Sequence, residues 1–88
     1  LDSLARGVRW LVDLQNGDGG WPTFCRGWGP LPFDRSSADL TAHAARALFR
    51  WMALPGVADA DPKSETARLR DEAKSALQNG FRFLDNAQ

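Results

Sequence analysis

Asp39 and His43 are the residues of this sequence whose types and spacing best suit acid–base chemistry. They stand four positions apart, so a helix would place both on one face. A cationic or hydrogen-bond-donating imidazole beside a carboxylic acid favours the ionised form of the acid and lowers its pKa, which makes the acid a stronger proton donor. The structural alternative is that Asp39 caps a helix and His43 is a partly buried histidine bonded to a carbonyl.

Metal and nucleophile chemistry find less support. Cys25, Asp39 and His43 are zinc-ligand types, but Cys25 lies outside any recognisable ligand spacing. No base is spaced to form a dyad with the thiol. The glycines of residues 17–20 lack the Lys-Ser/Thr that a phosphate-binding loop uses. We therefore predict no metal and no cofactor. A single cysteine also excludes an internal disulfide and fits a reducing compartment.

The elements that must position these residues repeat along the chain. Six residue pairs match at one offset, 88 − 15 = 73: Leu4/Leu77, Gly7/Gly80, Arg9/Arg82, Trp10/Phe83, Leu11/Leu84 and Gln15/Gln88. Because repeat units bury their apolar faces against neighbours, we expect the chain to be an excerpt of a larger array. Glycine is unfavourable inside a helix, so Gly7 and Gly80 indicate close approach by a neighbouring helix.

Apolar residues recur at three- and four-residue steps in three segments, which predicts helices over about 3–15, 38–53 and 62–87. A glycine- and proline-rich loop over 16–36 separates the first two. The domain organisation expected is one repeat at about 3–53, a linker at 54–61 and the start of the next repeat at 62–88. No strand pattern is prominent, so the predicted class is all-α.

Two capping signals accompany these helices. Ser36 and Asp39 are spaced like a capping box at the start of the second helix. Asp61 followed by Pro62 predicts the start of the third helix, with the acid as cap. The charged first half of that helix, residues 63–74, is expected to be a solvated outer face.

Composition excludes several function classes. The 88 residues carry eleven basic and eleven acidic side chains, so no nucleic-acid footprint is expected. No apolar run approaches the roughly 20 residues of a membrane span, and no signal peptide is visible. The prediction is a cytoplasmic protein.

Seven residues of the first repeat form a longer pattern: a basic residue, Gly, an aromatic, an aliphatic, Gln, Gly and Trp. They are Arg6, Gly7, Trp10, Leu11, Gln15, Gly19 and Trp21. This pattern resembles the QW motif of the triterpene cyclases, the squalene-hopene and oxidosqualene cyclase family. The resemblance implies a fragment of an α/α-toroid, an (α/α)6 barrel, in which the motif is structural. The Gln15 amide can bond groups at its helix end, and the Trp21 ring can stack on it.

A second resemblance concerns Asp39 and His43. Residues 39–43 read Asp-Leu-Thr-Ala-His, which is similar to the Asp-Val-Thr-Ala-His segment of squalene-hopene cyclases. The resemblance implies that His43 supports the catalytic acid of an upstream Asp-x-Asp-Asp motif, with Asp39 in the same polar network. That motif is absent from this sequence. Residues 59–62 echo it but lack the fourth acid.

The resemblance thus implies a segment of a class II triterpene cyclase, an isomerase in which protonation starts the cyclisation of a squalene-like substrate. Aromatic rings would stabilise carbocations, and the candidates in this sequence are Phe24, Trp28 and Phe33. The segment would be inactive alone, and a hydrophobic substrate suggests monotopic membrane association of the parent. One alternative is a non-catalytic α/α-repeat scaffold or interaction protein that keeps the QW clamps and lacks the pocket. The other partners expected are the remaining repeats of its own chain. A second alternative is a prenyltransferase-like zinc enzyme, although residues 39–41 lack the cysteine of that family.

Overall fold

The computed structural model describes residues 3–22 and 36–86 and is mostly helical there, which confirms the predicted all-α class. Its elements are α1 (Ser3–Leu14), β1 (Trp21–Pro22), β2 (Ser36–Ser37), α2 (Ala38–Met52) and α3 (Glu65–Asn86). The two strands, which the sequence analysis did not predict, pair antiparallel, with Trp21 opposite Ser37. None of the described helices is long and apolar enough to cross a membrane.

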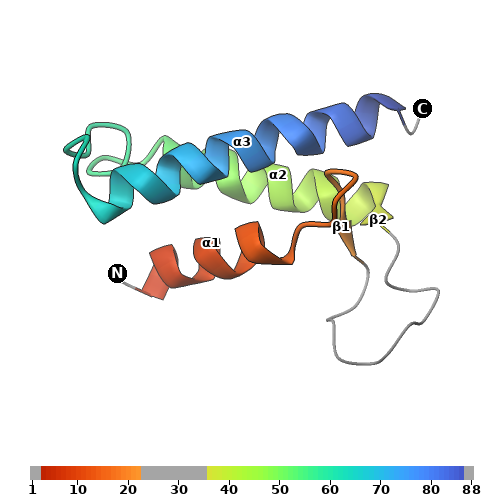
Figure 1. Cartoon of the computed structure of the whole chain (residues 1–88), viewed down its shortest axis with the longest axis horizontal. Helices are drawn as coiled ribbons and strands as arrows, with labels where there is room; N and C mark the ends of the chain where they lie inside the picture. Colours follow the sequence, from red (N-terminus) through yellow and green to blue (C-terminus); the bar gives the residue numbers. More distant parts are fainter. Residues whose placement is uncertain (1–2, 23–35, 87–88) are drawn as a thin grey trace.

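The helices α2 and α3 run antiparallel, and α1 lies along them in the same direction as α3 (Figure 1). Each helix presents a stripe of apolar side chains, repeated at helical spacing, to the centre of the structure, where these side chains are buried away from water. Leu48 of α2 and Ala73 of α3 are fully buried there, and Ala5 and Val8 bring α1 against the same core. The strand pair closes one end of this assembly, beside the first turn of α2.

The predicted capping box at α2 is wrong by one residue. Ser37 is the N-cap, and its side chain accepts a hydrogen bond of 3.3 Å from the backbone N–H of Leu40. Ser36 is held by the strand pair instead, and its hydroxyl donates to Asp18 Oδ1 at 2.6 Å. The helix ends close to the predicted position, with Ala53 as C-cap and Gly56 in the left-handed region at φ +86°.

The predicted start of α3 is also wrong, because the helix begins at Glu65 rather than at Pro62. Asp61 Oδ1 accepts from the N–H of Lys63 at 2.9 Å, which forms a local turn ahead of the helix. The hydroxyl of Ser64 then accepts from the N–H of Ala67 at 3.1 Å. Ser64 therefore supplies the cap that the sequence analysis assigned to Asp61.

The first half of α3 is only partly the solvated face that its charges predicted. Arg70 is half-buried and reaches back to the linker, where Nη1 donates to the carbonyl oxygens of Val57 and Ala58 at 3.0 and 3.2 Å. Val57 is buried against the core. The charged side chain thus anchors the linker to α3.

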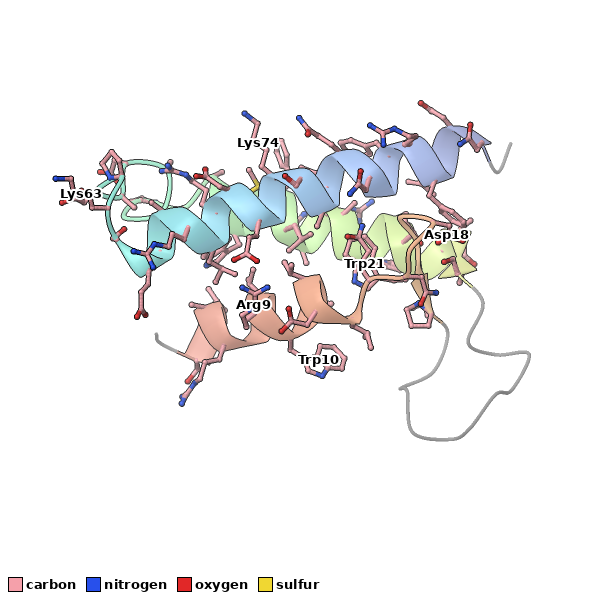
Figure 2. The ribbon with its side chains drawn as sticks, viewed as in Figure 1. Arg9, Trp10, Asp18, Trp21, Lys63 and Lys74 are labelled. Carbon is pink, nitrogen blue, oxygen red and sulfur yellow. The ribbon has the colours of Figure 1, made fainter. Side chains whose placement is uncertain are left out.

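A second charged residue joins α1 to α3. The guanidinium of Arg9 donates from Nη1 and Nη2 to the two carboxylate oxygens of Glu72, at 2.7 and 3.0 Å, and it also binds Asp13. Figure 2 shows Arg9 in the space between the two helices. The hydrogen bond to Glu72 is the main cause that raises the pKa of Arg9, and the same bond lowers the pKa of Glu72.

This pair predicts a small acid-dependent loss of stability. Because the pKa of Glu72 is lowered by folding, the stabilisation is present above the ordinary carboxyl pKa of about 4.3 and is lost as the pH falls through the lowered value. Glu72→Gln should lower the free energy of unfolding by roughly 0.5 kcal/mol at pH 7 and by much less at pH 2, since an exposed pair is screened by water. Urea unfolding at both pH values measures this. An equal loss at pH 2 and pH 7, or the same profile for Asp85→Asn, would contradict it.

Candidate functional site

Gln15, the residue directly after α1, ties the end of that helix to α3. Its Nε2 donates to the carbonyl oxygens of Gly19 and Ala76, each at 2.8 Å. Ala76 lies in the middle of α3, so its carbonyl also takes part in the helical pattern of hydrogen bonds. One amide therefore connects a helix end, the turn that follows it and a second helix. Stacking of Trp21 on this amide stays a prediction.

The turn between Gln15 and Trp21 is held by its own backbone and by two polar side chains. The N–H of Asn16 donates to Gly20 at 2.8 Å, and the N–H of Gly19 donates to Asn16 at 3.0 Å. Gly19 has φ +93°, a left-handed conformation that suits glycine. Asp18 Oδ1 accepts from the N–H of Gly20 at 2.9 Å and from the Ser36 hydroxyl. The acid thus joins the turn to the start of β2.

The Trp21 indole lies between the helices and is only 2% exposed (Figure 2). Its ring N–H donates to the carbonyl oxygen of Leu11 in α1 at 2.8 Å. Its backbone N–H donates to Oγ1 of Thr41 in α2 at 2.9 Å, and Thr41 is 0% exposed. Both N–H groups of this buried residue are therefore satisfied, each by a different helix.

Glycines let the turn and the indole approach α3 closely. A Cβ built on Gly80 would lie 3.1 Å from Cζ3 of Trp21 and 3.7 Å from Cγ2 of Thr41. A Cβ on Gly19 would overlap the carbonyl of Asn79. The close approach predicted at Gly80 is therefore present, but a tryptophan ring makes it rather than a helix. At Gly7 nothing in the described chain comes within 4 Å of such a Cβ, so that prediction is not met there.

We name the unit formed by Gln15, the turn 16–20, Trp21 and Thr41 the clamp. Of the predicted motif residues, the structure brings Gln15, Gly19 and Trp21 together in it. Arg6, Gly7 and Trp10 are exposed on α1 and take no part in it, and Trp10 points away from α3 (Figure 2).

Thr41, Asp18 and Ser36 are members of this site that the sequence analysis did not assign. The available signal for Thr41 was a hydroxyl in the first turn of a helix otherwise rich in Ala and Leu. The signal for Asp18 was its position between glycines, where an Asp side chain commonly accepts a hydrogen bond from the backbone N–H two residues later. Nothing local pointed to Ser36 as its partner.

Asp39 and His43 are both exposed on α2. Within residues 3–22 and 36–86, neither side chain makes a hydrogen bond or an ion pair. Thr41 lies between them in sequence but faces inward, because helix geometry turns residue 41 away from 39 and 43. One segment thus presents a structural hydroxyl to the clamp and two titratable groups to the outside.

The predicted cysteine and loop aromatics, Cys25, Phe24, Trp28 and Phe33, lie outside the described residues. In the part of the chain that the structure describes, no three His, Cys, Asp or Glu side chains gather where they could hold a metal ion.

An open groove of about 530 Å³ runs between α1 and α2. Its walls are mainly apolar side chains: Leu4, Val8, Leu11, Ala47, Trp51 and Leu54. Gly7 and Trp10 lie along its α1 side. The arrangement offers an apolar surface rather than a set of polar groups for chemistry.

The clamp predicts a large effect for one glutamine and a small one for another. Gln15→Ala removes two hydrogen bonds to backbone carbonyls and should lower the free energy of unfolding by about 1–3 kcal/mol. Gln78→Ala, at an exposed site in α3, should change it by less than about 0.5 kcal/mol. Urea denaturation followed by tryptophan fluorescence compares the two. Equal effects would show that the Gln15 bonds do not stabilise the fold.

A matched pair of glycines tests the turn. Gly19→Ala should destabilise the chain by about 1–3 kcal/mol, because residue 19 has a positive φ and an added Cβ meets the Asn79 carbonyl. Gly17→Ala should be tolerated, since a Cβ there has nothing within 4 Å. Thermal unfolding of both variants gives the comparison. A Gly19→Ala variant as stable as Gly17→Ala would rule out this geometry.

Known proteins were compared with the chain at three levels: protein-family models, curated sequences and solved structures. None of the three comparisons gives a match.

Proposed function

We propose that this chain is one unit of an α/α-toroid of the class II triterpene cyclase type. The observation that carries the proposal is the clamp, in which Gln15 and Trp21 hold α1, α2 and α3 together. In a barrel built from helix pairs, each pair must be held rigidly to the next. This clamp joins the pair α1 and α2 to the following helix, α3. The chain is then a structural unit that is inactive alone.

The chemistry proposed for the array is cyclisation of a squalene-like polyprene, started by protonation of an alkene. An alkene is a very weak base, so the proton donor must be a strong acid held away from water. His43 would donate a hydrogen bond to that acid and so favour its ionised form. Asp39, four residues earlier, would orient the imidazole. Their exposure on α2 leaves both side chains accessible to an acid on another unit.

A second candidate is a scaffold of the same fold without catalysis. The observation that favours it is that the polar contacts described for the clamp are structural. They join backbone and side-chain groups of this unit to one another. Such a scaffold would keep the clamp and have no need of His43.

The complete protein encoded by the gene tests both candidates. It should convert squalene to cyclised hydrocarbons detectable by gas chromatography and mass spectrometry. His43→Ala should lower kcat by roughly 10²–10⁴-fold and change the pH profile of kcat, because the acid loses its partner. Arg46→Ala, an exposed site one turn further along α2, should leave both unchanged. A folded protein without cyclase activity would support the scaffold, and a fully active His43→Ala variant would remove the role of His43.

A further inference from the structure

The face of α3 that meets the clamp has a counterpart on α1. Four residues of α3 form the contact: Ala76, Asn79, Gly80 and Phe83. The Ala76 carbonyl accepts a hydrogen bond from Gln15. The other three lie close to Gly19, Trp21 and Gly20, respectively. The 73-residue offset of the internal repeat maps these positions onto four residues of α1: Ser3, Arg6, Gly7 and Trp10. Glycine stands at the same place in both sets, and an aromatic residue stands at the last place in both.

The two faces differ in what covers them. Gly80 is buried under the Trp21 ring, whereas Gly7 faces open space. Leu77, which precedes Gly80, is 7% exposed, and its counterpart Leu4 is 59% exposed. Trp10 is 54% exposed, which is unusual for so large an apolar side chain. The α1 face therefore has the residues of a clamp-binding face without a clamp among the described residues.

The other sides of the two helices differ in the opposite sense. Ala5 and Val8 of α1 are buried in the core of this unit. Their counterparts in α3, Gln78 and Phe81, are exposed, and Phe81 is 51% exposed. Thus α3 buries its clamp-binding side and exposes the other side. In α1 the clamp-binding side is exposed and the other side is buried. Units stacked head to tail would bury both open faces by repeating the contacts already present here.

We infer that Ser3, Arg6, Gly7 and Trp10 form a second clamp socket, which receives the Gln-x-x-x-Gly-x-Trp turn of a preceding unit in the same array. In that socket a glutamine amide donates to the carbonyl of Ser3, and an indole lies over Gly7. The helix that follows the incoming turn covers Leu4 and the groove between α1 and α2. The socket continues an interface that the structure already contains.

A second copy of this chain is a poor occupant of the socket. Its own Trp21 is buried against its own Gly80, and its Gln15 is bonded to its own Ala76. A copy would have to break these contacts to donate its clamp. A unit whose following helix is α1 itself has no such competing site. The inference rests on the repeat and on the α3 interface, and a negative cyclase assay would not affect it.

The test compares the chain with a tandem protein made of residues 1–73 followed directly by residues 1–88. In the tandem, the second α1 replaces the second half of the first α3, so the first Trp21 faces the second Gly7. Gly7→Leu in the single chain should raise the folding equilibrium constant about 2–5-fold, because an exposed helical glycine is replaced. The same substitution in the second unit of the tandem should lower it by about 10-fold or more, because the side chain overpacks the socket.

Gly80→Leu in the single chain is the matched control, and it should lower the folding constant to a similar extent as Gly7→Leu in the tandem. The unmodified tandem should unfold in one transition at higher urea concentration than the single chain. Three results would overturn the inference: Gly7→Leu stabilising both proteins alike, a tandem no more stable than the single chain, or a single-chain dimer that Gly7→Leu dissociates. The last would assign the face to self-association.

Discussion

The burial of one indole between three helices is the constraint on which the rest of this structure depends. Removing Trp21 from water is favourable for its ring, but each N–H buried without a partner would cost about 1–3 kcal/mol. Leu11 accepts the ring N–H and Thr41 accepts the backbone N–H, so burial fixes α1 and α2 relative to the ring. Gly80 provides the space for the ring on α3. The positions of all three helices thus follow from the surroundings of one side chain.

The turn before Trp21 determines where this residue enters the space between the helices. Gly19 takes a positive φ, and the backbone bonds of Asn16 close the loop tightly against α3. Asp18 and Ser36 then tie this turn to the two-residue strand that leads into α2. Because the hydroxyl of Ser36 is engaged there, the cap of α2 moves to Ser37. A helix boundary is therefore set by a contact with residues about 18 positions earlier in the chain.

Charged groups hold the periphery rather than the centre. Arg9 bridges α1 and α3 through Glu72, and Arg70 fastens the linker to α3 through two carbonyl oxygens. The exposed Arg9–Glu72 pair contributes little to stability. Asp39 and His43 also lie outside the core. Their proposed chemistry needs a partner from another unit, so in this fold catalysis and assembly would be the same event.

The sequence by itself determined the helices, their apolar stripes and the glutamine and tryptophan of the clamp, because these depend on local periodicity and on a short repeated pattern. It did not determine the start of α2, since Ser36 and Ser37 are both competent caps and the tertiary bond from Ser36 to Asp18 chooses between them. It also missed the start of α3, where Asp61 closes a local turn on Lys63 and Ser64 supplies the cap. Likewise, Gly7 and Gly80 are equivalent in sequence. Only the tertiary structure decided that Trp21 packs on Gly80, because that ring can occupy a single site at a time.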